Sequence, residues 1–197
     1  MLDAAGLNLR ASLPIARYDA AVPEAWRSAA LLPQARSAIL VANGGRAFWD
    51  AFACAPEFGA PIDPLDSFTR RVIEAAAREL EPGALARFPF ERRGGGYADF
   101  VELGRLAGLG AASRLRLLLH PSYGPWISLR AIVLARGDWE IGPGAPPGFD
   151  PCRDCPAPCE RAGSDLGARR RACVVGPEHT YSEAELAHHA KYALGPT

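Results

Sequence analysis

The chain has 197 residues, of which 49% are hydrophobic, and its 22 lysines and arginines equal its 22 aspartates and glutamates. This length and apolar fraction suffice for one substantial domain with a normal core, and they exclude a largely disordered chain. Zero formal net charge argues against a protein that coats nucleic acid, because binding phosphates requires a positive field. We therefore do not expect nucleic acid as the main partner.

The first half of the chain predicts alternating strands and helices. The strongest helix signal covers residues 62–83, where Asp63 is expected to cap the helix and Pro64 fits its first turn. Three earlier elements are predicted: a half-buried strand over 8–18, a helix over 22–33 and a buried central strand over 37–43.

The second half predicts a short strand over 87–92, a helix over 97–109, and two strands around a tight turn over 113–141. A linker with four prolines follows at 142–151. The last helix, over 181–194, has Ser182 and Glu185 at capping-box spacing. This order indicates an α/β or α+β core with a cysteine-rich C-terminal appendage. We expect a core domain at 1–141, a cysteine segment at 142–180, and a helix packing on the core at 181–197.

The cysteines indicate a metal or redox site. No secretory signal opens the chain, and no stretch reaches the roughly 18 apolar residues of a membrane span, so we expect a cytoplasmic protein with reduced thiols and no membrane partner. Four thiolates could hold zinc tetrahedrally, or iron in an iron–sulfur cluster. The candidate ligands are Cys152, Cys155 and Cys159, spaced C-x₂-C-x₃-C, and Cys173.

An alternative remains open for this segment. Its spacing differs from that of bacterial ferredoxins, and Gly163 stands where a fourth closely spaced cysteine would fall. The segment could therefore be a proline-stiffened loop whose cysteines bind nothing. The fifth cysteine, Cys54, stands alone and is expected to be a core thiol. The basic run GARRRAC, residues 167–173, is expected to be a solvated face, with a phosphate or tRNA contact as the alternative.

The turn around residues 120–126 groups His120, Tyr123 and Trp126 beside Gly124. Such a tip can present an imidazole and flat aromatic surfaces to a planar cofactor. The alternative is an ordinary turn with Trp126 as a core residue.

The segment HPSYGPWISLRAIVL, residues 120–134, resembles the H-P-x-[FY]-G-x-W-x-x-[LI]-R-[AG] segment of CblC-type cobalamin-processing proteins. It is also similar to the corresponding strand of epoxyqueuosine reductases, which depend on cobalamin and iron–sulfur clusters. Segments 63–73 and 179–192 resemble further CblC-type segments in the same order. The resemblance implies a nitroreductase-like α/β sandwich, with an antiparallel or mixed sheet flanked by helices, that holds a corrinoid.

The implied function is a cobalamin-dependent or cobalamin-reducing oxidoreductase or processing protein, to which the cysteine cluster delivers electrons from a donor protein. Queuosine chemistry itself is not expected, because the G-W-x-G-K-N element of those reductases is absent. Relatives of this fold often dimerise, so a homodimer is one expectation. The alternative is an iron–sulfur or zinc protein without a corrin, acting as an electron carrier or as a structural or interaction domain. The residues implied to line the corrinoid pocket are His120, Tyr123, Gly124, Trp126 and Arg130.

Overall fold

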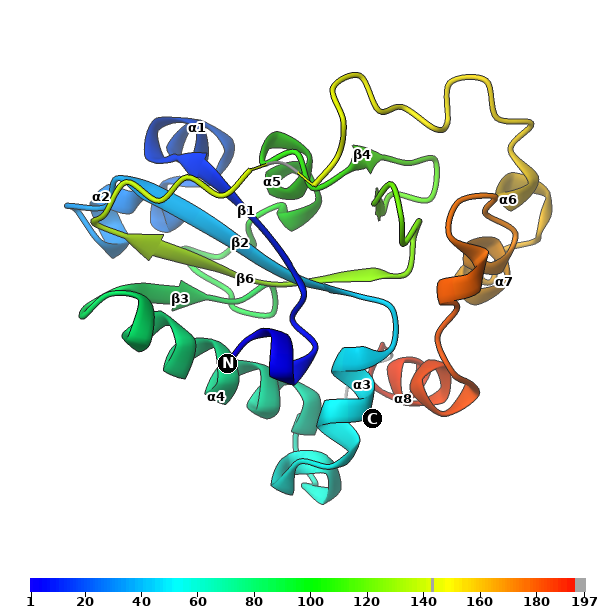
Figure 1. Cartoon of the computed structure of the whole chain (residues 1–197), viewed down its shortest axis with the longest axis horizontal. Coiled ribbons are helices and arrows are strands. Elements are labelled where there is room, and N and C mark those ends of the chain that lie inside the picture. The colour runs from blue at the N-terminus through cyan, green and yellow to red at the C-terminus, as the bar shows by residue number, and fades with distance from the viewer. Residues whose placement is uncertain (143, 194–197) are drawn as a thin grey trace.

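A four-stranded antiparallel sheet forms the centre of the computed structural model, which describes residues 1–142 and 144–193. Its strands run in the order β1-β2-β6-β3 (Figure 1). Helices cover both faces of this sheet, so the expected class, an antiparallel sheet flanked by helices, is confirmed. The strands are β1 (Leu9–Pro14), β2 (Ser37–Gly44), β3 (Leu85–Arg87) and β6 (Ile127–Ala135).

The two central strands, β2 and β6, are apolar because both of their faces are covered. All of β2 is buried, as the apolar run over residues 38–42 predicts. The pairing of β2 with β6 changes register once: Val41 lies opposite Ala131, but the next residue, Ala42, lies opposite Leu129. Arg130 is therefore the extra residue of a β-bulge. Bulges of this kind redirect a side chain and are common beside functional sites.

Each face of the sheet has its own hydrophobic core. One face packs against α3 (Ala47–Ala53) and α4 (Pro64–Leu80), and its core is rich in phenylalanine. The other face packs against α1 (Ile15–Ala21) and α5 (Phe100–Leu106), with Trp26 at its centre. The long helix predicted over 62–83 is therefore confirmed, with its apolar side against the sheet.

The remaining elements are short. In Figure 1, the elements from α6 (Pro158–Arg161) to α8 (Glu183–Ala193) gather at the end of the sheet where β6 begins. No helix in the described part of the chain is long and apolar enough to cross a membrane. The short elements that complete the described structure are η1 (Asp3–Ala5), η2 (Glu24–Trp26), α2 (Ser28–Leu31), η3 (Pro56–Gly59), β4 (Ala111–Ala112), β5 (Leu118–Leu119), α6 (Pro158–Arg161), α7 (Leu166–Arg171), η4 (Pro177–His179) and α8 (Glu183–Ala193).

The tight turn lies where expected, but the strand before it has a different partner. β5 pairs with β4 and not with β6. The turn closes on itself through an isolated bridge between His120 and Gly124, and the chain then leads into β6, which pairs with β2 and β3. The expectation of a simple two-stranded hairpin over 113–141 was therefore wrong.

The helix expected over 22–33 is broken. Arg27 has an extended backbone with ψ 152°, which separates η2 from α2. Asp19 accounts for the break, because its carboxylate accepts hydrogen bonds from the backbone nitrogen of Ser28 at 2.7 Å and from the Ser28 hydroxyl at 2.6 Å. The start of α2 is thus capped by a side chain that lies outside it.

Two expectations about single residues also differ from the structure. Asp63 precedes α4 as expected, but it adopts a left-handed backbone with φ 40°, and its side chain makes no capping hydrogen bond. Cys54 is exposed at the end of α3 and is not a core thiol. The final helix begins as predicted, with the Ser182 hydroxyl accepting from the backbone nitrogen of Glu185 at 3.2 Å. Residues 194–197 of the expected C-terminal helix segment lie outside the described residues.

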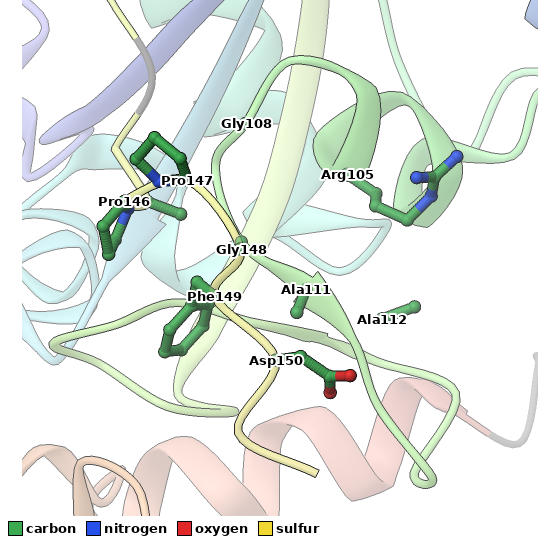
Figure 2. A pocket seen from close by; sticks show the side chains of 11 residues that line it. Arg105, Gly108, Ala111, Ala112, Pro146, Pro147, Gly148, Phe149 and Asp150 are labelled. Atoms are coloured by element: carbon green, nitrogen blue, oxygen red, sulfur yellow. The ribbon is translucent and has the colours of Figure 1, made fainter. Parts of the chain in front are cut away.

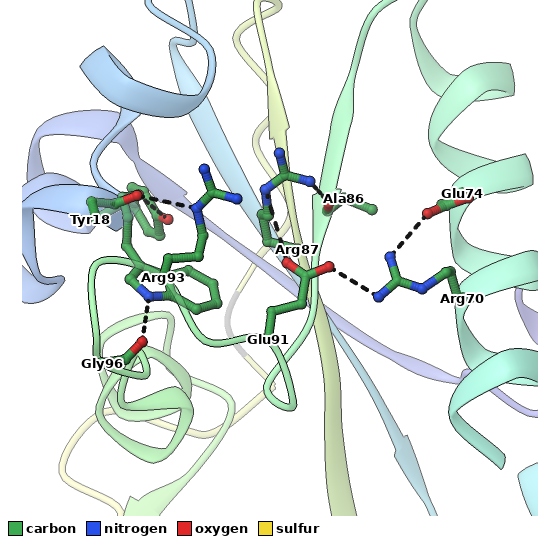
Figure 3. Close-up of polar contacts among 10 residues, drawn as sticks. Tyr18, Arg70, Glu74, Ala86, Arg87, Glu91, Arg93 and Gly96 are labelled. Carbon is green, nitrogen blue, oxygen red and sulfur yellow. Dashed lines mark hydrogen bonds and ion pairs between the residues drawn. The ribbon is translucent and has the colours of Figure 1, made fainter. Parts of the chain in front are cut away.

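An ion-pair network joins α4 to the turn after β3 (Figure 3). Glu91 lies 3.1 Å from Arg70 and 3.9 Å from Arg87. The Arg70 guanidinium also stacks 4.5 Å from the centre of the Phe88 ring. Burial lowers the pKa of Arg87, and the charge of Glu91 opposes that shift. The short edge strand β3 is thereby fixed to the long helix.

Candidate functional site

The four predicted ligand cysteines come together around one enclosed hollow of about 20 Å³. Three of them come from the loop before α6 and from α6 itself, and the fourth follows α7. The rest of the wall is mainly apolar. The lining includes Cys152, Cys155, Cys159, Cys173, Leu115, Leu119, Ala157 and Val174. We refer to this hollow as the cysteine pocket.

The electrostatics of the cysteine pocket suit a positively charged occupant. Burial raises the pKa of Cys173, and negative charge on Cys159, Cys152 and Cys155 raises it further, whereas a hydrogen bond from the Val175 backbone lowers it. Ionised Cys159, Cys152 and Cys155 are thus close enough to Cys173 to disfavour its thiolate by repulsion. A metal centre would remove that repulsion, because metal binding stabilises thiolates.

The pocket is not closed around a single ion. Among residues 1–142 and 144–193, no group of three or more His, Cys, Asp or Glu side chains is arranged to hold one metal ion. A tetrahedral zinc site brings its sulfur atoms to roughly 4 Å from one another. An iron–sulfur cluster distributes its cysteine ligands over several iron atoms. Four cysteines are a donor set that both an iron–sulfur cluster and zinc use.

Gly163 explains why the fourth ligand candidate lies so far along the chain. It has φ 85°, a left-handed conformation that a cysteine would adopt only with strain. A Cβ on Gly163 would meet nothing within 4 Å, and Gly163 is not part of the lining of the cysteine pocket. Asp165 then caps α7 by accepting from the backbone nitrogen of Ala168, and α7 leads back to Cys173.

His120 is buried, and one of its nitrogens is already engaged. Its Nδ1 accepts hydrogen bonds from the backbone nitrogens of Ser122 at 3.1 Å and Tyr123 at 3.4 Å. Burial, with a smaller contribution from the charge of His179, lowers the pKa of His120 to about 4. At neutral pH the ring is therefore uncharged and carries its proton on Nε2. His120 can donate a hydrogen bond from Nε2, but it can bind a metal there only by giving up this arrangement.

The turn packs directly against the segment that carries Cys173. Gly124 has φ 54°, and a Cβ on it would lie only 1.9 Å from the carbonyl oxygen of Val175. Tyr123 lies across Gly44 and contacts the His179 ring, with 4.5 Å between ring centres. Both predicted sites, the turn and the cysteine pocket, are therefore in contact.

Trp126 is fully buried below two side chains from the C-terminal segment. Its ring lies 5.3 Å from that of Tyr181, and the Arg170 guanidinium lies 4.8 Å from both rings. Arg170 also donates to the carbonyl oxygen of Pro125. The basic run was expected to be a solvated face, but its middle arginine points inward and joins α7 to the turn. Trp126 lies in the interior, and it is not part of the lining of the cysteine pocket.

Arg130, at the β-bulge, is the predicted corrinoid residue that lines an open hollow. Its Nε donates to Asn43 Oδ1 at 2.7 Å, and its guanidinium lies 4.3 Å from the centre of the Phe48 ring. Arg130 is only 8% exposed, and burial lowers its pKa. The hollow has a volume of about 380 Å³ and is lined by Asp63, Pro64, Leu65, Asp66, Ser128, Arg130, Arg170, His188 and His189. We refer to it as the arginine pocket.

Buried donors without a hydrogen-bond partner among the described residues include Arg130 Nη2 and Arg170 Nε, whose residues line the arginine pocket, and Nδ2 of Asn43, the residue bound to Arg130. Buried polar atoms are nearly always hydrogen-bonded, so these donors leave capacity for an oxygen acceptor. Asp66 also lines the pocket. Burial raises its pKa, with a further increase from Asp63, and Arg130 opposes the shift. The pocket can therefore bind a ligand with oxygen acceptors.

A larger hollow of about 520 Å³ lies between residues at α5 and β4 and the segment 145–150 (Figure 2). Residues 144–150, which we call the strap, pass over a floor of glycine and alanine. The strap is fixed where the backbone nitrogen of Ala145 donates to the carbonyl of Gly108 at 2.8 Å. Phe149 and Asp150 of the strap line the hollow, and so does Arg105 of α5. None of the five residues predicted to line the corrinoid pocket lines this hollow.

Sequence reasoning missed Asn43, Asp66 and Arg170. Asn43 is fully buried within β2, and a polar residue inside an apolar run was the signal that could have drawn attention to it. Asp66 and Arg170 carry no comparable signal, because each resembles an ordinary charged residue on a helix.

The fold defines a mixed α/β protein with an antiparallel sheet flanked by helices, and one solved structure among those compared shares it with a TM-score above 0.5. The B12-trafficking protein CblC of C. elegans matches with a TM-score of 0.52 and 17% identity, over 90% of this chain and 83% of that chain. Epoxyqueuosine reductase from Streptococcus thermophilus matches with a TM-score of 0.49 and 14% identity, over 88% of this chain and 55% of that chain. Epoxyqueuosine reductase from Bacillus subtilis matches with a TM-score of 0.48 and 14% identity, over 84% of this chain and 50% of that chain.

The likeness to CblC shows the fold that the sequence resemblance implied. This chain spans about half the length of the two epoxyqueuosine reductases. No protein-family model matches the sequence, and no curated protein does.

Proposed function

We propose that the protein binds a corrinoid and acts as a cobalamin-reducing or cobalamin-processing oxidoreductase, with an iron–sulfur cluster in the cysteine pocket as the source of electrons. The observation that best supports the proposal is the contact between Gly124 and Val175, two residues after Cys173. It joins the cysteine pocket to the turn that resembles cobalamin-processing proteins. The partners in this proposal are a small-molecule corrinoid and an electron-donor protein.

The arginine pocket supplies the contacts that a corrinoid needs. Corrinoids carry peripheral amides and a phosphate, whose oxygens accept hydrogen bonds. Arg130 Nη2 and Arg170 Nε are buried donors of the lining that have no other partner among the described residues. A bound corrinoid would supply a cobalt centre that accepts electrons. In this proposal His120 donates from Nε2 and does not ligate cobalt, because its Nδ1 is held by two backbone groups.

The test is an anaerobic absorption spectrum of the purified, iron- and sulfide-reconstituted protein, before and after addition of cobalamin. The expected results are a broad band near about 400 nm that bleaches with dithionite and a shift of the corrin bands on binding. Arg130→Met should weaken the corrin shift without removing the bleaching band. If the corrin spectrum is unchanged at high protein concentration, the corrinoid assignment is wrong.

A second candidate function is an iron–sulfur or zinc protein without a corrin, serving as an electron carrier or structural domain. The burial of Trp126 and His120 favours it, because neither ring is presented on the wall of an open hollow. Iron and sulfide in the protein without any corrin shift would support this candidate. Zinc bound without colour, in place of iron, would support its structural form.

A further inference from the structure

The first and last cysteines of the C-x₂-C-x₃-C motif share one structural feature. The backbone carbonyl of each accepts a hydrogen bond from an arginine. Arg114 Nη2 donates to the carbonyl of Cys152 at 3.3 Å, and Arg169 Nε donates to that of Cys159 at 3.2 Å. Arg114 comes from the turn between β4 and β5, and Arg169 comes from α7. The motif is therefore held at both ends, from two different parts of the molecule.

Arg114 makes a second contact with the same segment. Its Nη1 lies 3.6 Å from Glu160 Oε1 at the start of α6, and Arg114 is part of the lining of the cysteine pocket. A third arginine, Arg161, donates to the carbonyl of Pro156 at 2.9 Å. Arg161 therefore makes the same kind of hydrogen bond as Arg114 and Arg169, but to a residue that is not a candidate ligand.

These contacts place positive charge beside an otherwise apolar wall. Arg169 is partly buried, so its charge acts through a lower dielectric than that of an exposed arginine. Groups that hydrogen-bond to a metal ligand orient it and alter the properties of the metal. The reduction potential of an iron–sulfur cluster depends on the local charge, because reduction adds a negative charge.

Resting on the proposed iron–sulfur cluster, we propose that Arg114 and Arg169 are positioning residues that hold the outer two ligand cysteines in place and raise the reduction potential of the cluster. The forked guanidinium matters for the first role, because lysine retains the charge but not the directed N–H groups. The charge alone matters for the second role. Lysine variants can therefore separate the two roles.

The first measurement uses the metal-free full chain. Iodoacetamide alkylation of Cys159 would be followed by mass spectrometry in wild type, in R114Q/R169Q and in R161Q/R171Q. Both double variants lose two positive charges, but R161Q/R171Q leaves the carbonyls of Cys152 and Cys159 bound. We expect Cys159 to react about tenfold faster in R114Q/R169Q, in line with the usual cost of losing outer-shell contacts. Equal rates in the two double variants would refute the positioning role.

The second measurement is a potentiometric titration of the reconstituted cluster. We expect the potential of R114Q/R169Q to become more negative by an amount equivalent to about a tenfold change in the ratio of reduced to oxidised cluster, or about 59 mV for one electron. R114K/R169K should keep most of the wild-type potential while still losing the protection of Cys159. A potential that shifts equally in R161Q/R171Q would refute a specific effect.

The two measurements also separate this inference from the proposed function. Wild-type protein that takes up no iron and sulfide would overturn the cluster, and with it the effect on potential. The alkylation comparison would still decide whether the two arginines hold the cysteines in place.

Discussion

Gly124 and Val175 are packed so closely that no side chain fits between them, since a Cβ on Gly124 would lie 1.9 Å from the Val175 carbonyl oxygen. This contact is where the turn meets the cysteine-bearing segment. We expect Gly124→Ala to lower the free energy of unfolding by about 2–4 kcal/mol, from overpacking and from its φ of 54°. Gly95→Ala is the matched control: its φ is 83°, but a Cβ there meets nothing within 4 Å.

The measurement is guanidinium unfolding of both glycine variants. Gly95→Ala should cost about 1–2 kcal/mol, from backbone strain alone. If the two variants lose the same stability, the contact between the turn and the cysteine-bearing segment contributes nothing.

Cys173 is the fourth ligand in the proposed cluster, so its replacement should abolish stable metal binding. We expect Cys173→Ser to lose most of the iron and sulfide that the wild type retains after gel filtration. Cys54→Ser is the control, because Cys54 is exposed at the end of α3 and should leave the iron content unchanged. Equal iron content in wild type and Cys173→Ser would show that the other three cysteines suffice.

Asn43 and Arg130 should respond differently to substitution, although they bind each other. Asn43→Ala leaves the buried Arg130 guanidinium without the acceptor at 2.7 Å and is expected to cost about 3–5 kcal/mol. Arg130→Met removes the charge and keeps much of the volume, but it leaves the buried Asn43 amide unpaired, so it is expected to cost about 1–3 kcal/mol, less than Asn43→Ala. Urea unfolding measures both. A larger loss for Arg130→Met would mean that the pair is net stabilising.

Stability should depend on pH through His120. Its pKa is lowered from 6.5 to about 4 in the folded chain, so between these values the unfolded chain binds more protons. Stability therefore falls as the pH drops from about 6.5 to about 4 and levels off below that range. His120→Asn can still accept the turn hydrogen bonds and should flatten this part of the profile. Urea midpoints at several pH values test this, and an unchanged slope in the variant would assign the effect to another group.

The sequence predicted the fold where local signals agree with long-range packing. The apolar run of β2 and the amphipathic pattern of α4 each specify both the type of element and the faces of it that are buried. The pairing of β5 with β4 could not be predicted, because strand partners depend on residues far apart in the chain. The break after Arg27 has a similar cause, since Asp19 from another helix caps α2.

The candidate site was predictable to the extent that its residues are close in sequence. The three cysteines of the motif and the turn both carry visible spacing. The arginine pocket was not predictable, because Arg130 reaches it through a β-bulge that becomes apparent only when β2 and β6 are paired. Arg170 is one of three consecutive arginines, and only the packing of α7 determines which of them points inward.

The chain at Ile141 closes one side of the central sheet. The backbone nitrogen of Ser12, on the edge strand β1, donates to the carbonyl of Ile141 at 3.1 Å, and the backbone nitrogen of Ile141 donates to the Ser12 hydroxyl at 2.8 Å. At the opposite edge, β3 is only three residues long. Short or covered edges prevent strands of other molecules from adding to a sheet. Aggregation by strand addition should therefore require prior local opening of the segment around Ile141, and any pairing of two copies in the native state should use helical surfaces instead.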